Sequence, residues 1–358
     1  MNFIKTLVYY TLFLIVASCS YSYENIEIYN TNGIPSTNQS FSYMYFKNEY
    51  EGYLFGTYEE YLNLDEAIKN PKTPSKIKYE RNVYKTTDGG HNWKKVAKIS
   101  IKDGIFYGDN AIINHNNLYI NTTNITGNDN FIDIFSFEES KIISSKKLEF
   151  DFFTFLEGDK DAIYSSTSNR NNKNNKIILY NSDFKIIDSI NTNLNFSEGI
   201  VINNTAYTIS RDSNKGNKHL YTIDKEGFAN EINLSIYPEN IIQINSDNIL
   251  LAGNDKSDTS KVKFINHNIN TGRNKVIKEV NNYTIVNYLQ SNNKGLILAF
   301  IGNISGPFVS YDLIYSQDYG KTWTIKKLKE NLSISPNHLI NNTLYIYSST
   351  KEIQKITL

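Results

Sequence analysis

Short apolar segments that each follow a polar turn recur from one end of the chain to the other. They are Gly52-Tyr53-Leu54-Phe55, Asn117-Leu118-Tyr119-Ile120, Asp161-Ala162-Ile163-Tyr164, Thr205-Ala206-Tyr207-Thr208, Asn248-Ile249-Leu250-Leu251, Gly295-Leu296-Ile297-Leu298 and Thr343-Leu344-Tyr345-Ile346. The third residues of the first two segments are 65 positions apart, and the later spacings lie between 43 and 48. A period of roughly 40–50 residues is typical of four-stranded propeller blades. The pattern therefore predicts an all-β, seven-bladed β-propeller.

The two ends of the chain predict how the ring closes. After its apolar segment, the last repeat has room for one more strand, Glu352 to Leu358, which leaves that blade one strand short. The segment Asn25 to Tyr29 alternates like a strand but precedes the first repeat. We expect it to supply the missing outer strand, because pairing the two ends removes an open sheet edge. The long first spacing places an insertion at Tyr58 to Glu80, in which residues 65–70 could form a helical turn before Pro71.

Two copies of one short motif mark turns of this architecture. They read Thr86-Thr87-Asp88-Gly89-Gly90-His91-Asn92-Trp93 and Ser316-Gln317-Asp318-Tyr319-Gly320-Lys321-Thr322-Trp323, and both fit Ser/Thr-x-Asp-x-Gly-x-x-Trp. The Asp carboxylate can accept hydrogen bonds from turn N–H groups, and the Gly supplies a positive φ. The Trp can place a large apolar ring between blades. Fainter turns of the same period are expected near Glu138, Asp183, Asp224 and Asn268.

This motif resembles the Asp-box, or BNR repeat, of sialidase-like and related β-propellers. The segment from Tyr84 to Gly90 is similar to the photosystem assembly-factor type. The resemblance implies a scaffold role for Thr86, Asp88, Gly90, Trp93, Ser316, Asp318, Gly320 and Trp323, and it implies a protein-binding scaffold rather than a reaction. The first copy departs from the family pattern at Asn92, where Thr is preferred.

Composition narrows the function further. The chain has 37 basic and 37 acidic residues, which gives no sign of a basic face and argues against a nucleic-acid partner. Its five histidines are scattered, no metal-binding spacing occurs, and no phosphate loop or nucleophile elbow is present. We therefore expect no metal, no cofactor and no catalytic residue. We also expect a monomer.

The N-terminus predicts export and lipidation. Lys5 precedes an apolar run from Leu7 to Val16, which is too short to span a membrane and suits a signal peptide. It ends in Val16-Ala17-Ser18-Cys19, which resembles a bacterial lipobox, and Cys19 is the only cysteine. The resemblance implies cleavage before Cys19 and a lipid on its thiol. We expect a signal peptide over 1–18, a lipidated tether over 19–24 and one propeller domain over 25–358. Ser20 favours the outer membrane where sorting follows the enterobacterial pattern.

Candidate binding residues come from the loops. In a propeller, the loops from strand two to three and from strand four to the next blade share one face, opposite the Asp-motif turns. That face should carry the insertion and the loops at 168–176, 212–218, 255–261 and 303–311, and loops on a rigid scaffold often bind ligands. Tyr58, Tyr61, Arg81, Arg170 and Arg211 are the candidates there, since Arg grips carboxylates in a two-pronged manner. Arg273, the fourth arginine, should lie near a turn of the opposite face.

Three functions remain open at this point. The first is a lipid-anchored envelope scaffold that binds a protein or glycan. The second is a sialidase-like glycoside hydrolase, which requires Arg81, Arg170 and Arg211 to converge near a tyrosine or carboxylates. The sialidase Arg-Ile-Pro signature is absent, and we place no nucleophile. The third is an immunity lipoprotein that neutralises a periplasmic toxin.

Overall fold

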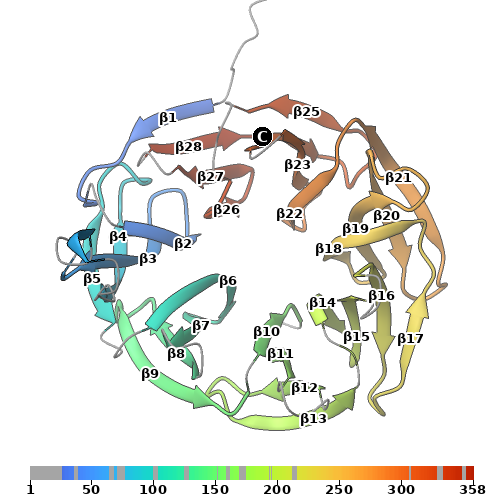
Figure 1. Ribbon diagram of the computed structural model, residues 1–358. Coiled ribbons are helices and arrows are strands. Elements are labelled where there is room, and N and C mark those ends of the chain that lie inside the picture. The colour runs from blue at the N-terminus through green and yellow to red at the C-terminus, as the bar shows by residue number, and fades with distance from the viewer. Residues whose placement is uncertain are drawn as a thin grey trace, which may run out of the picture.

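Seven four-stranded antiparallel sheets stand in a ring around a central axis (Figure 1). The computed structural model describes residues 26–35, 39–63, 68–70, 77–99, 104–124, 129–150, 152–158, 162–168, 175–192, 194, 196–211, 216–305, 308–328, 334–348 and 352–358. Within them, each of the first six sheets consists of four consecutive strands, so each is one blade. The predicted seven-bladed propeller is confirmed. The predicted signal peptide and Cys19 lie outside the described residues.

The blades are numbered in chain order, and the strands of each blade are arranged from the central axis outward. Blades 1 and 2 contain β2 (Gln39–Phe46), β3 (Gly52–Tyr61), β4 (Ile77–Thr86), β5 (Lys94–Ile99), β6 (Gly104–Asn114), β7 (Asn117–Asn124), β8 (Asn130–Ser136) and β9 (Lys141–Leu148). Blades 3 and 4 contain β10 (Phe152–Leu156), β11 (Ile163–Ser168), β12 (Asn175–Tyr180), β13 (Ile186–Thr192), β14 (Phe196–Ile202), β15 (Thr205–Arg211), β16 (Lys218–Ile223) and β17 (Ala229–Ile232). Blades 5 and 6 contain β18 (Ile236–Asn245), β19 (Asn248–Asp255), β20 (Lys261–Asn268), β21 (Asn274–Asn281), β22 (Ile285–Ser291), β23 (Ile297–Ser305), β24 (Phe308–Ser316) and β25 (Thr324–Lys327). Blade 7 contains β26 (Asn337–Ile340), β27 (Thr343–Tyr347), β28 (Glu352–Thr357) and β1 (Ile26–Asn30).

Blade 7 closes the ring with the two ends of the chain. Strand β1 pairs antiparallel with β28, from Ile26 opposite Ile356 to Asn30 opposite Glu352 (Figure 1). The chain after β1 then joins the Asp-motif turn of blade 1, because the Asn32 N–H donates to His91 O and the Trp93 N–H donates to Asn32 O, both at 2.9 Å. The expected closure is therefore confirmed, and it also couples blade 7 to blade 1.

The core is divided among the interfaces between neighbouring blades. Seven clusters of buried apolar side chains occur in the described residues, one for each interface. Six of them include buried aromatic rings, such as Phe264 between blades 5 and 6. The cluster between blades 3 and 4 is small, and its buried members are all aliphatic: Leu156, Ile177, Val201, Ala206 and Ile223. Its two aromatic rings, Tyr164 and Phe196, pack against the cluster but are only partly buried.

Both Asp-motif turns have the hydrogen bonds that their residue types predict. In blade 1, the Gly90 N–H donates to Thr86 Oγ1 at 3.0 Å, and the Asn92 N–H donates to Asp88 Oδ1 at 2.9 Å. The indole N–H of Trp93 donates to Gly90 O at 2.7 Å. Asn92 replaces the usual Thr without loss, because its side-chain amide donates to Asp88 Oδ2 at 2.7 Å.

The blade 6 copy of this turn is equivalent. The Gly320 N–H donates to Ser316 Oγ at 2.8 Å, and the indole N–H of Trp323 donates to Gly320 O at 2.9 Å. Asp318 accepts from the Thr322 N–H and hydroxyl at 2.8 and 2.7 Å. These bonds from Thr322 hold the pKa of Asp318 at about 2. The carboxylate is therefore charged and structural at neutral pH.

Candidate functional site

The two ends of the ring differ in the loops they carry. Because consecutive strands are antiparallel, the connections β3–β4, β15–β16 and β19–β20 lie at one end, which we call the loop face. The turns β4–β5 and β24–β25, which hold the two Asp motifs, lie at the other end, which we call the Asp-motif face. The insertion of blade 1 is thus on the loop face, as predicted. Ile68 and Lys69 within it are helical, whereas residues 65–67 of the expected turn lie outside the described part.

Arg81 is not a loop residue, and the expectation that it faces a ligand is corrected. Strands β3 and β4 extend to Tyr61 and Ile77, so Arg81 pairs with Thr57 inside the ladder. Its guanidinium lies 2.9 Å from Asp133 Oδ2 of β8, and the two side chains are 2% and 0% exposed. The hydroxyl of Thr122 also donates to Asp133 Oδ2, at 3.1 Å. The pair joins blade 1 to blade 2 and is closed to solvent.

The other four candidate binding residues occupy different positions in the structure. Tyr58 lies half-buried within β3 rather than in a loop. Tyr61 ends the same strand, and its side chain lies outside what the structure describes, as does the whole of Arg170. Arg211, at the end of β15, is exposed on the loop face and lines a pocket. Arg81 and Arg211 therefore belong to different places in the ring, between blades 1 and 2 and between blades 4 and 5.

The pocket at Arg211 has a volume of about 330 Å³ and lies between blades 4 and 5. Blade 4 contributes Arg211 and Lys218, and blade 5 contributes Tyr237 and Glu239. Its remaining lining residues are Gly216, Asn217, Asn254, Thr259 and Thr284. The Lys218 ammonium forms an ion pair with Glu239, which leaves Arg211 as the pocket's second cation. Among the lining residues that the structure describes, two cations stand against one carboxylate beside a tyrosine ring, which suits an acidic group on a polar ligand.

A β-bulge and a bridging side-chain amide fix the positions of the residues that line this pocket. Glu239 is the extra residue of a β-bulge in β18, between Pro238 and Asn240, and a bulge re-aims the side chain at that place. Asn254 donates its side-chain amide to Thr259 O at 3.2 Å and to Thr284 O at 3.0 Å. This fixes the far wall of the pocket against the start of blade 6. The lining therefore comes from strands and braced loops rather than from one long loop.

Glu198 of β14 ties blade 4 to blade 5 near this pocket. Its carboxylate accepts from the Ile241 N–H at 3.0 Å and from the Asn240 side-chain amide at 3.2 Å. Burial raises the pKa of Glu198 to about 7, although the hydrogen bonds from Ile241 and Asn240 and the nearby Lys218 charge oppose that rise. The group therefore titrates near neutral pH, so the charge balance around Lys218 depends on pH.

Sequence reasoning located the loops of this pocket but missed three of its features. The sequence predicts the loops at 212–218 and 255–261 on this face, but its loop pattern does not indicate Glu198, Glu239 or strand β18. The only signal in the sequence is Pro238 inside a strand, because a proline there often marks a bulge.

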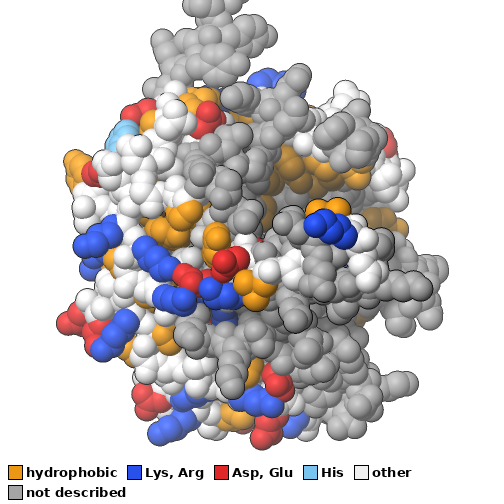
Figure 2. All heavy atoms as spheres, turned by 60° about the vertical axis from the view of Figure 1, so that its left-hand side comes forward, with side chains coloured by type: hydrophobic (Ala, Val, Ile, Leu, Met, Phe, Trp, Pro, Cys, Tyr) orange, Lys and Arg blue, Asp and Glu red, His pale blue; other side chains and the backbone are white. Residues whose placement is uncertain are grey.

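Charge elsewhere on the molecule is mixed. On the side that carries the outer strands of blades 1 and 2, acidic and basic side chains are interspersed (Figure 2). Lys95 and Lys98 both pair with Glu80 there, and Lys147 pairs with Asp129 at 2.6 Å. No three His, Cys, Asp or Glu side chains of the described residues converge as a metal site requires. Among those residues, no helix is long and apolar enough to span a bilayer.

Comparisons with known proteins support the fold. No family model and no curated protein matches the chain. An oligogalacturonate lyase solved with manganese is similar over 93% of this chain and 96% of its own, with 9% identity and a TM-score of 0.60. The propeller domain of the Pyrococcus furiosus Trilobed protease covers 90% of this chain and 91% of its own, with 14% identity and a TM-score of 0.54. An uncharacterized Listeria monocytogenes protein covers 88% and 91%, with 12% identity and a TM-score of 0.53.

These likenesses show a β-propeller and nothing finer, because identity is low throughout. The Pyrococcus domain is described as having an open velcro topology. In the present chain β1 pairs with β28, so the ring is closed by its own termini.

Proposed function

We propose that this protein is a lipid-anchored, non-catalytic scaffold of a bacterial envelope, of the Asp-box propeller type, that binds an acidic group of a protein or glycan at the Arg211 pocket. The observation that carries the proposal is the pocket itself, in which Arg211 and the Lys218–Glu239 pair stand beside Tyr237 on the loop face. A position among the loops of a rigid scaffold is typical of ligand sites.

The position of β1 supports the proposal that a lipid on Cys19 anchors the protein. Cys19 precedes Ile26, the first residue of β1, by only a few residues, and β1 is the outer strand of blade 7 (Figure 1). A lipid on Cys19 would hold the ring at the edge of that blade, on the opposite side from blades 3 and 4. Where lipoprotein sorting follows the enterobacterial pattern, Ser20 after Cys19 favours the outer membrane for this anchor.

The hydrolase alternative is not favoured by the arginines that can be placed. It requires three convergent arginines, but Arg81 is engaged by Asp133 between blades 1 and 2, and Arg211 lines a pocket between blades 4 and 5. A buried arginine paired with a buried carboxylate is costly to withdraw for ligand binding.

The test is photo-crosslinking in the producing cells. A photoreactive phenylalanine analogue replaces Tyr237, and the captured proteins and glycans are identified. We expect Arg211→Glu to remove the specific adducts. Arg273→Glu, the same exposed substitution on a turn of the opposite face, should leave them unchanged. Adducts that survive Arg211→Glu would contradict the site. Separately, Cys19→Ala should abolish lipid labelling and membrane fractionation.

A further inference from the structure

The outer turns between the third and fourth strands of the blades do more than reverse the chain. Each of five such turns, or the residue that directly ends it, carries an apolar side chain that packs against the preceding blade. These side chains are Trp93 against blade 7, Phe137 against blade 1, Phe184 against blade 2, Ile269 against blade 4 and Trp323 against blade 5. We call these side chains interblade plugs. Blade 7 has no such turn, because its third and fourth strands are the two ends of the chain.

The turn of blade 4 has the same backbone design as that of blade 3 but lacks the plug. In blade 3, Asn181 Oδ1 accepts from the N–H groups of Asp183 and Lys185, and the Phe184 N–H donates to Asn181 O. In blade 4, Asp224 Oδ1 accepts from the N–H groups of Glu226 and Phe228, and the Gly227 N–H donates to Asp224 O. Gly227 thus occupies the position of Phe184.

Gly227 lies directly against blade 3, with no room for a side chain. A Cβ atom added to it would meet Asn191 O at 2.5 Å and Ile190 Cγ2 at 3.3 Å, both on β13 of blade 3. The equivalent Phe184 side chain is buried and stacks on Tyr180 with ring centroids 4.1 Å apart. The aromatic side chain of the blade 4 turn, Phe228, is instead 69% exposed. The blade 4 turn therefore keeps its hydrogen bonds but presents no apolar side chain to blade 3.

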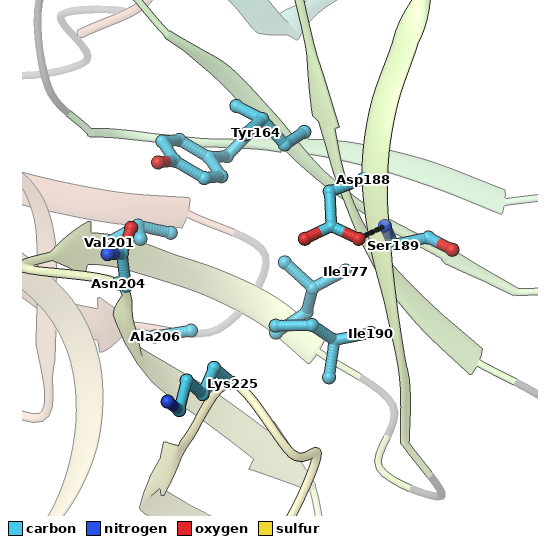
Figure 3. Close-up of a pocket in the computed structure, with 10 residues that line it drawn as sticks. Tyr164, Ile177, Asp188, Ser189, Ile190, Val201, Asn204, Ala206 and Lys225 are labelled. Atoms are coloured by element: carbon cyan, nitrogen blue, oxygen red, sulfur yellow. Dashed lines mark hydrogen bonds between the residues drawn. The ribbon is translucent and has the colours of Figure 1, made fainter.

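An open cleft of about 240 Å³ lies at this unplugged interface (Figure 3). Its walls are mainly apolar: Tyr164, Ile177, Leu179, Ile190, Val201 and Ala206. Asn204 and Lys225 place its mouth on the Asp-motif face. An engineered apolar cavity of about 150 Å³ stays dry and binds benzene. A cleft of this size and lining is therefore suited to an aromatic ring.

The surroundings of the cleft indicate what presents such a ring. Ile186 and Ile187, just before Asp188 on β13, are 59% and 61% exposed, and Phe228 follows Gly227. The two neighbouring exposed isoleucines beside an apolar cleft favour a protein surface as its occupant. One carboxylate oxygen of Asp188 accepts from the Ser189 N–H at 2.7 Å, and the other points toward the cleft (Figure 3). No cation of the described residues pairs with Asp188, whereas Lys225 pairs with Glu226 and Lys185 with Asp183.

We propose that the cleft between blades 3 and 4 is a docking site for an aromatic side chain of a partner protein that carries a lysine or arginine next to that ring. The ring fills the apolar cleft at the interface that lacks an interblade plug, and the basic group pairs with Asp188. The site is on the Asp-motif face, so it is distinct from the Arg211 pocket and goes beyond the binding function proposed there.

The test is a titration of the full-length protein with a short peptide, acetyl-Gly-Trp-Lys-Gly-amide, that contains 5-fluorotryptophan and is followed by ¹⁹F NMR. We expect saturable binding that weakens about tenfold or more when Ala replaces Trp in a competing peptide, as for a buried aromatic anchor. Glu in place of Lys should weaken binding several-fold, because it would face Asp188.

Variants of the protein locate the binding. Ala206→Leu fills the cleft and should weaken the peptide about tenfold, while raising the melting temperature if the added atoms fit. Asp188→Lys should weaken it about as much as the Glu peptide does, and Asp247→Lys, on an exposed turn of the same face, should not. Arg211→Glu should leave peptide binding unchanged, which separates this proposal from the function above.

Three results would overturn the proposal. The first is absence of saturable binding, and the second is binding that is insensitive to both Ala206→Leu and Asp188→Lys. The third is self-association of the purified protein that Phe228→Ser abolishes, because the cleft would then hold the turn of a second copy. If Ala206→Leu does not fold, Asp188→Lys and its Asp247→Lys control decide the question alone.

Discussion

Replacing Glu198 by Gln should change how stability depends on pH. The folded-state pKa of Glu198 is about 7, against an ordinary value of 4.5, because burial disfavours its charged form. Between these two values the folded protein holds a proton that the unfolded chain releases, so stability falls as pH rises through this window. The loss is complete above the folded-state pKa. Glutamine cannot ionise, so the variant should not show this loss.

The magnitude follows from the pKa difference. A rise from 4.5 to about 7 corresponds to about 3 kcal/mol at roughly 1.4 kcal/mol per pKa unit, as an upper value. In the Glu198→Gln variant, the new amide oxygen can still accept from the Ile241 N–H, which now bonds Glu198 Oε1 at 3.0 Å. The new amide nitrogen would meet the Asn240 amide, which can rotate to offer Oδ1, an atom with no partner among the described residues. We therefore expect equal stability near pH 4.5.

The assay is calorimetric unfolding of both proteins from pH 4.5 to 8. The difference in melting temperature should be near zero at the acid end and reach about 4 °C in favour of the variant at pH 8, given the size of the domain. Other buried acids, such as Glu157 and Asp133, titrate in both proteins and cancel in the difference. A difference independent of pH would refute the reasoning, since it would show that Glu198 is charged throughout or that the substitution acts through shape.

The contacts that hold the ring together can be tested in the same way. Arg81→Met should lower the free energy of unfolding by about 3–5 kcal/mol, because the buried Asp133 carboxylate would lose its cationic partner. Combining Arg81→Met with Asp133→Leu should restore most of that loss. A double-mutant cycle measured by denaturant unfolding tests this, and additive losses would contradict it. Asp88→Ala should lower the free energy of unfolding by about 0.5–1.5 kcal/mol, because the exposed Asn92 N–H would exchange its bond to the carboxylate for one to water, and an unchanged denaturation midpoint would contradict a structural role for Asp88. Deleting 26–30 should expose β28 to limited proteolysis and lower the melting temperature, whereas an unchanged digestion pattern would show that closure by β1 is dispensable.

The ring and its closure could be predicted because they depend on a regular feature of the sequence. Second strands of the blades are buried on both sides, so they appear as continuous apolar segments, and their spacing is the length of a blade. Closure followed from counting strands, since a last blade with three strands requires a fourth. Both inferences use only the type and order of residues, which a sequence contains in full.

The candidate site could be predicted only in part, because strand ends and side-chain partners are tertiary properties. Arg81 was expected in a loop because the sequence between Tyr58 and Glu80 looks like an insertion. The ladder of β3 and β4 continues into that segment, so Arg81 lies within the sheet and its partner is Asp133 of the next blade. Arg211 was assigned to the correct face, but the acid that shares its pocket, Glu239, comes from a bulge in another blade.

The interblade plugs show that turns without the Asp motif can still be identified by the structural roles of their residues. The Asp motif combines two physical roles in eight residues: an oxygen that satisfies the turn, and a ring that fills the interface. In blade 3 the roles belong to Asn181 and Phe184, so the turn is recognisable only by what each residue does. In blade 4 Asp224 accepts the hydrogen bonds of the turn, but Gly227 has no side chain to fill the interface. Because the backbone of the turn forms its own hydrogen bonds, the absence of a plug reduces packing at one interface and leaves the fold intact. A repeat protein can therefore open a cleft at one position of a closed ring while the other blades supply its stability.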